Sequence, residues 1–139
     1  MADIQFPNTT FGAGLFNAQI KDNNGLPSNV LEAGAEFQVL VDWHVGDLAA
    51  ALLGGLWEVN VYVESLGPGP EKRVGTATVA VNGGRDYYVT VTVPKNSVDD
   101  QPKPPVSGAY KLVTVLRHSN FGRRTEVGAI YDGPTVLIA

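Results

Sequence analysis

Basic and aromatic side chains gather in one short stretch near the end of the chain, and this stretch is the best candidate for ligand recognition. Its members are Arg117, His118, Phe121, Arg123 and Arg124. A guanidinium group presents a planar fork of N–H donors that matches carboxylate and phosphate groups, so such a loop suits an acidic ligand or an acidic partner surface. A solvated β-turn has the same composition, and both interpretations stay open.

A second candidate for chemistry is His44, which follows Asp42 by two residues, a spacing that puts both side chains on one face of a strand. A histidine beside a carboxylate can act as a general base, but no nucleophile in a recognisable motif accompanies the pair. Glu58 and Glu64 lie about 20 Å apart along one strand, too far for the carboxylate pair of a glycosidase. We interpret these two glutamates as solubility charges and expect no enzyme activity.

Three other motifs are better explained as turns than as binding sites. Residues 22–25 lack the alternating ligands and the distal glutamate of a calcium loop. Gly83 and Gly84 signal a hairpin, because neither a helix start nor a Lys-Ser/Thr pair follows them to bind phosphate. Residues 8–10 match a glycosylation sequon but read as an ordinary polar loop. The sequence therefore predicts neither a metal site nor a cofactor.

Length and composition limit which partners and which cellular compartments are expected for the chain. With 139 residues, a formal net charge of −4 and no cysteine, it is expected to fold as one domain without disulfides and without a nucleic-acid partner. Its longest apolar run, residues 48–53, is too short to cross a membrane, and its start lacks the features of a Sec signal peptide. We expect cytoplasmic synthesis and leave the compartment open, with virion or extracellular assembly both compatible.

Most of the chain alternates apolar and polar residues at the period of a β-strand. Val and Thr dominate these segments and Gly and Pro separate them, which is typical of an all-β domain with little helix. The alternation predicts seven strands, at residues 16–21, 37–45, 56–65, 74–81, 87–93, 110–116 and 127–138, the last one broken or bulged near its middle. We expect a seven-stranded antiparallel β-sandwich at residues 11–139, preceded by an extended arm at residues 1–10.

One segment between the second and third predicted strands has a different pattern. Asp47 is followed by leucines and alanines at residues 48–53, which predicts one or two helical turns with Leu48, Leu52 and Leu53 on one face. That face either covers an open end of the sandwich as a lid or contacts another subunit. The lid is the simpler interpretation.

Two landmark residues give the predicted sandwich a resemblance to a known fold family. Trp43 lies on the second strand, and Tyr110 begins the sixth in a Gly108-x-Tyr110 sequence. With seven strands, this pattern resembles fibronectin type III and, more broadly, immunoglobulin-like domains, in which such a tyrosine forms the tyrosine corner. The resemblance implies scaffolding, adhesion or assembly. The chain is longer than the ~100 residues usual for that fold and lacks the cysteine pair of antibody domains.

Two function classes follow. The favoured class is a non-catalytic structural module that self-associates as a homo-oligomer, or docks with other subunits into a filament, virion or cell-surface structure. Its candidate contacts are Phe6, Leu48, Leu52, Leu53, Val136 and Ile138. The alternative is a ligand-binding module, with carbohydrate as the ligand class, that uses aromatic and polar residues such as Tyr62, Tyr88, Phe121 and Arg123. The apolar end of the chain either pairs in the core sheet or exchanges between subunits.

Overall fold

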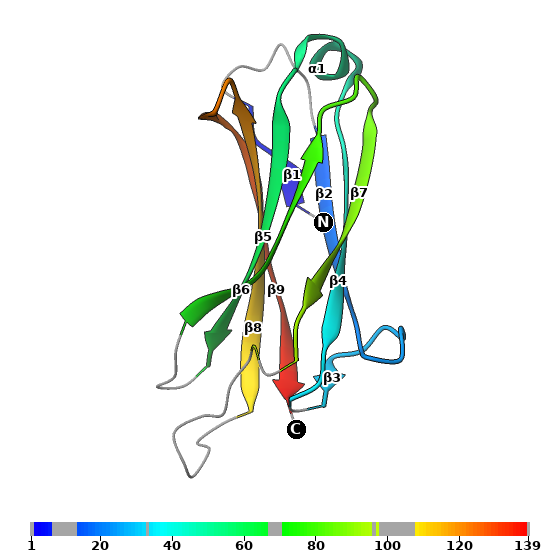
Figure 1. Cartoon of the computed structure of the whole chain (residues 1–139), viewed down its shortest axis with the longest axis vertical. Helices are drawn as coiled ribbons and strands as arrows, with labels where there is room; N and C mark the ends of the chain where they lie inside the picture. The colour runs from blue at the N-terminus through cyan, green and yellow to red at the C-terminus, as the bar shows by residue number, and fades with distance from the viewer. Residues whose placement is uncertain are drawn as a thin grey trace.

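Two β-sheets packed face to face form the framework of the protein (Figure 1). The computed structural model describes residues 2–6, 14–32, 34–66, 71–95, 97 and 108–138. The four-stranded sheet has the order β1 (Ala2–Ile4), β2 (Gly14–Lys21), β4 (Phe37–His44), β7 (Asp86–Val93). The five-stranded sheet has the order β3 (Val30–Leu31), β9 (Arg123–Ile138), β8 (Ala109–Asn120), β5 (Leu56–Ser65), β6 (Glu71–Ala80). Neighbouring strands are antiparallel, except that β3 and β9 are parallel.

The predicted β-sandwich is confirmed, but it has more strands than the alternation predicts. Nine strands are described instead of seven, and the additional ones are β1 and β3. β1 lies in the segment interpreted as an arm, where it pairs with β2 and buries Ile4 in the core. Met1 and residues 7–10 of that arm lie outside the described residues. Strands of two or three residues are too short to show alternation, which is recognisable over about four residues or more.

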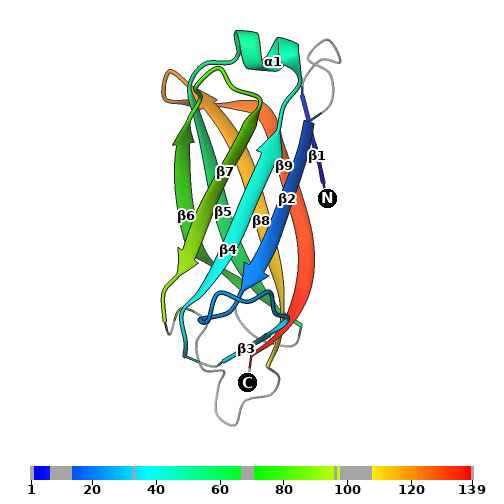
Figure 2. The same cartoon turned by 90° about the vertical axis from the view of Figure 1, so that its right-hand side faces the viewer.

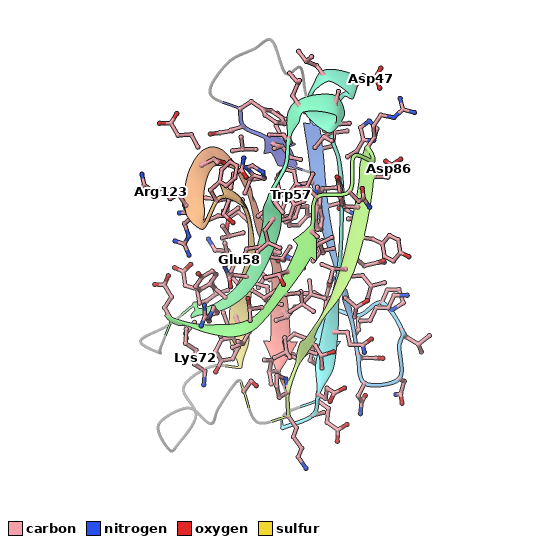
Figure 3. All side chains as sticks on the ribbon, turned by 45° about the horizontal axis from the view of Figure 1, so that its top comes forward. Asp47, Trp57, Glu58, Lys72, Asp86 and Arg123 are labelled. Atoms are coloured by element: carbon pink, nitrogen blue, oxygen red, sulfur yellow. The ribbon has the colours of Figure 1, made fainter. Side chains whose placement is uncertain are left out.

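An aromatic cluster joins the two sheets near α1. Trp43 and Trp57, from opposite sheets, meet edge to face with 6.0 Å between their ring centroids, and Trp43 stacks on Tyr87 at 5.5 Å. Phe16 completes the cluster, 6.4 Å from Trp43. Figure 3 shows Trp57 between the sheets. Phe16, Trp43 and Tyr87 lie side by side in register on β2, β4 and β7, so the alternation of three strands turns their rings inward together.

The only helix in the described part of the chain, α1 (Asp47–Leu52), covers one end of the sandwich (Figure 2). Its buried residues are Ala49 and Ala50, while Leu48 and Leu52 are 38% and 64% exposed. This corrects the expectation that the leucines form the packing face, because the small alanine side chains let the helix lie close to the strand ends. A contact role for the two leucines stays a prediction. α1 is too short to cross a membrane, and no longer apolar helix exists within the described ranges.

β9 is not broken at the residues predicted to break or bulge the last strand, but the predicted bulge is present there, with residues 133 and 134 of β9 opposite one residue of β8. The β8–β9 register shifts between Lys111 and Val113, as expected for a bulge. Beside this shift, Lys111 Nζ lies 3.2 Å from Asp132 Oδ1 and 3.9 Å from Glu64 Oε2. The hydrogen bond to Asp132, the charge of Asp132 and the charge of Glu64 raise the pKa of Lys111.

We expect Asp132→Asn to lower the pKa of Lys111, because the change removes both the hydrogen-bonding carboxylate and its charge. A lysine pKa raised by folding stabilises the folded state below the ordinary lysine value of 10.5, and this contribution is lost as the pH rises through the folded value. NMR titration of the labelled Lys111 side chain measures the shift. Glu36→Gln is the control, because it removes a carboxylate that directly precedes β4 of the four-stranded sheet, whereas Lys111 lies in the five-stranded sheet. An identical Lys111 titration in Asp132→Asn would contradict the contact.

Candidate functional site

The outer face of the four-stranded sheet carries polar side chains in ordered rows. β2, β4 and β7 lie side by side (Figure 2), and their register places one residue of each strand in each row. The two central rows are Asn17–Asp42–Tyr88 and Gln19–Leu40–Thr90. Because their neighbours in sequence fill the core, the alternation of each strand directs these six side chains outward.

A hollow of about 170 Å³ lies among the two central rows. Tyr88 stands at its side with 84% of its surface exposed, whereas aromatic residues usually bury most of their surface. Asn17 Nδ2 donates to Asp42 Oδ1 over 3.3 Å. The remaining oxygens of Asn17 and Asp42 have no hydrogen-bond partner among the residues that the structure describes. The hollow therefore combines an aromatic ring with amide and carboxylate groups that are free to bind a hydroxylated ligand.

His44 pairs with Asp86 and not with Asp42. His44 Nδ1 lies 2.6 Å from Asp86 Oδ1, and both side chains are exposed, by 49% and 83%. The β4–β7 register places these two residues directly opposite each other, while Asp42 lies two residues along the same strand and contacts Asn17 instead. The sequence spacing therefore pointed to the wrong carboxylate, because the nearest neighbour of an outward side chain is across the strands.

The predicted ligand loop is a tight hairpin whose turn contains only Phe121 and Gly122, because β8 continues to Asn120 and β9 begins at Arg123. Phe121 at the tip is 97% exposed. Arg117 and Arg124 are also exposed, and both line a hollow on the outer face of the five-stranded sheet. Arg123 extends from the hairpin on the side away from β7 (Figure 3).

His118 is the member of that loop which lies in the interior. It is 1% exposed, and its ring packs 5.1 Å from the ring of Trp57. Its Nε2 lies 2.6 Å from the carbonyl oxygen of Gly54, and its Nδ1 lies 2.9 Å from Thr125 Oγ1. A carbonyl can only accept, so Nε2 donates to Gly54. His118 is therefore a structural link between β8 and the end of the α1 loop, and its side chain is not available to a ligand at the surface.

The residues predicted as an assembly interface are distributed between core and surface. Val136 is 1% exposed, so its side chain is buried and cannot contact a partner. Phe6, Leu53 and Ile138 are half-buried. The last strand pairs with β8 and β3 of its own chain, which is the first of the two arrangements considered for it. Leu137 follows Val136 and faces the opposite side of β9, where it is 47% exposed. It was not among the contact residues predicted from the sequence.

Sequence reasoning singled out Tyr88 but missed the side chains around it. Asn17, Gln19, Leu40 and Thr90 occupy outward positions of alternating strands, and this is a signal that the sequence contains. What the sequence lacks is the order of the strands, which alone brings β2, β4 and β7 together. On a single strand, an outward polar residue that belongs to a binding site cannot be distinguished from an ordinary solvent-exposed residue.

No family model and no curated protein sequence matches this chain. Its fold is similar to that of the C-terminal domain of wzt, with a TM-score of 0.62 and 11% identity over 99% of this chain and 78% of that one. It is also similar to part of a β-glucosidase from Listeria innocua, solved in complex with isofagomine and in complex with glucose. The TM-scores are 0.54 and 0.52, with 13% and 15% identity over 90% of this chain.

These likenesses concern the fold alone, because the identities are low. The chain spans only 16% of the β-glucosidase chain, whereas it spans most of the wzt domain. The matches extend over both sheets, since at least 90% of this chain is included in each. The chain is thus a β-sandwich similar in fold to the C-terminal domain of wzt and to a segment of a glucosidase.

Proposed function

We propose that this chain is a non-catalytic carbohydrate-binding module that holds a sugar against the outer face of the four-stranded sheet. The observation that carries the proposal is the ring of Tyr88, which is 84% exposed beside a hollow lined by amide, carboxylate and hydroxyl groups. Ligand sites commonly combine aromatic surface with a few placed polar groups. A pyranose ring matches both, because its C–H face packs on an aromatic ring while its hydroxyl groups form hydrogen bonds at the edge.

The polar groups of the hollow suit a neutral sugar. The amides of Asn17 and Gln19 each offer donors and an acceptor, and the carboxylate of Asp42 accepts from hydroxyl groups. Leu40 adds apolar surface between them. Asp42 is the only charged residue in the two central rows, so an anionic ligand would meet repulsion there.

The fold neighbours support a carbohydrate-related role. One of them is a structure of a β-glucosidase in complex with glucose. This chain corresponds to only 16% of that enzyme, so we propose no glucosidase activity for it. The assembly role favoured by the sequence receives no support from the comparisons and stays a prediction. The finer resemblance to immunoglobulin-like and fibronectin type III domains also stays a prediction, beyond the β-sandwich itself.

Tyr88→Ala is expected to weaken sugar binding at least about tenfold, because the loss of one aromatic contact is worth roughly 1.4 kcal/mol. Stability should change by no more than about 0.5 kcal/mol, since the ring is exposed. A glycan array with the intact chain identifies the saccharide. Isothermal titration calorimetry with that saccharide, and with glucose as the first probe, then measures the affinity of both proteins.

Phe121→Ala is the matched control for this experiment. Phe121 is also a highly exposed aromatic residue, but it lies in the turn between β8 and β9 of the five-stranded sheet, so its removal should leave the affinity for a neutral saccharide unchanged. Asn17→Ala, in the same row as Tyr88, should weaken binding in parallel with Tyr88→Ala. Equal affinity of the native chain and Tyr88→Ala, or no binding to any glycan on the array, contradicts the proposal.

A further inference from the structure

A second polar hollow, of about 160 Å³, lies next to the β8–β9 hairpin on the outer face of the five-stranded sheet. The side chains that line it at the surface include Glu58 of β5, Arg117 and Ser119 of β8, and Arg124 of β9. The β5–β8 register places Glu58 directly opposite Arg117, and the β8–β9 register places Ser119 opposite Arg124. Three strands thus bring one carboxylate and two guanidinium groups to the same place.

Glu58 is held in position from two sides. Asn60 Nδ2 donates to Glu58 Oε1 over 2.7 Å, and Arg124 Nη2 lies 3.4 Å from the same oxygen. Asn60 is 2% exposed, so the amide that orients the carboxylate is itself fixed by packing. Glu58 Oε2 has no hydrogen-bond partner within the described ranges, and a carboxylate oxygen can accept more than one. A fixed acceptor is therefore available at the hollow.

Arg117 supplies the donors. It is exposed and forms no ion pair or hydrogen bond with any residue that the structure describes, although it lies opposite Glu58. Its guanidinium group keeps all of its N–H donors, two of which can bind one carboxylate in parallel. Arg123 and Arg124 add positive charge on the same hairpin, in a chain whose net charge is −4.

Phe121 does not line the hollow itself, but it adds an apolar surface at the tip of the hairpin, directly before Gly122, which does line it. It is 97% exposed, and its φ of 52° is in the left-handed region. Gly122 follows with a φ of 76°, so the two residues form the kind of two-residue turn in which Asn-Gly is favoured. A phenylalanine is strained there and gains nothing from burial. Strain of this kind, kept at an exposed position, points to a functional role for the ring.

We propose that this hollow binds a hydroxycarboxylate, and that a sugar acid is the ligand class that matches its groups. The ligand carboxylate binds the paired donors of Arg117, a neighbouring hydroxyl donates to Glu58 Oε2, and the carbon face of the ring packs on Phe121. Phosphate and sulfate match less well, because they bring more negative charge toward the Glu58 carboxylate. This site lies on the sheet opposite Tyr88 and does not depend on the proposed neutral-sugar site.

An NMR titration of the backbone amides with D-glucuronate tests the proposal. We expect shifts at residues 117–124 and at Glu58, and Arg117→Gln should weaken the affinity at least about tenfold, as expected for the loss of charged hydrogen bonds. Arg73→Gln is the control, because it removes the same charge from an exposed position on β6 of the same sheet. The methyl ester of glucuronate keeps the hydroxyl groups without the charge and should bind more weakly by a similar factor.

Phe121→Asn separates binding from structure. Asparagine tolerates a positive φ better than phenylalanine, so this variant should melt at a higher temperature and yet bind glucuronate more weakly. Tyr88→Ala should bind glucuronate normally, which distinguishes failure of this site from failure of the neutral-sugar site. The proposal is overturned by an absence of shifts at the hairpin, by equal weakening in Arg73→Gln, or by phosphate binding as tightly as glucuronate.

Discussion

Trp57→Ala is expected to lower the free energy of unfolding by about 3–5 kcal/mol, the usual cost of truncating a large aromatic residue in a packed core. Trp57 is 0% exposed, and the centroids of three rings, Trp43, Tyr87 and His118, lie 5.1 to 6.0 Å from its own. These rings come from both sheets, so they cannot close the resulting cavity without changing the distance between the sheets. Urea denaturation followed by circular dichroism measures the loss.

The neighbouring residue provides the matched control for that measurement. Leu56 precedes Trp57 on β5 but faces outward and is 37% exposed, so Leu56→Ala should cost less than about 1 kcal/mol. Trp57→Phe should be intermediate, because Trp57 Nε1 has no hydrogen-bond partner within the described part of the chain and only packing is lost. If Trp57→Ala lowered the free energy of unfolding no more than Leu56→Ala, packing of the aromatic cluster would not stabilise the contact between the two sheets.

Gly55→Ala is expected to lower the free energy of unfolding by about 3 kcal/mol or more, since it combines backbone strain with a collision. Gly55 has a φ of +94°, and a β-carbon placed there would lie 2.1 Å from the carbonyl oxygen of Ser119. That oxygen belongs to the backbone of β8, so it cannot rotate away as a side chain would. Either β8 or the segment that leads from α1 into β5 must shift, and the same denaturation experiment measures the cost.

A second glycine separates the two contributions. Gly83 has a φ of +79° with nothing within 4 Å of the added β-carbon, so Gly83→Ala tests the strain alone and should cost about 1–2 kcal/mol. The difference between the two variants measures the collision with Ser119. Equal losses would mean that the α1–β5 connection does not lie against β8 as closely as described.

The β-strands could be predicted because their signal is local. On residues 37–45 and 56–65, every second side chain is large and apolar, and the structure buries these residues, among them Trp43 and Val59. His118 was misplaced because the predicted strand ended two residues too early, at Leu116. In the structure His118 faces the core on the same side of β8 as Leu112 and Leu116, so a strand extended to residue 118 would have placed it in the core instead of in a ligand loop.

The helical insert predicted at residues 47–53 is confirmed at Asp47–Leu52, but its buried face was predicted wrongly, for a different reason. Leu48 and Leu52 are more apolar than Ala49 and Ala50, so hydrophobicity alone assigns the leucines to the buried face. The structure buries the alanines instead, and their small side chains let the helix lie close to the strand ends. Steric fit of this kind depends on atoms from distant segments, and a sequence pattern carries no information about it.

The sequence by itself determined where the seven longer strands form, because a period of two residues is set by the backbone and shows in strands of this length. The tertiary structure decided which outward side chains become neighbours. Glu58 and Arg124 are 66 residues apart and meet only through the order β9–β8–β5, and Tyr88 joins Asp42 and Asn17 only through the order β2–β4–β7. Strand order and register depend on packing between distant segments, so both candidate sites could be recognised only after the sheets were assembled.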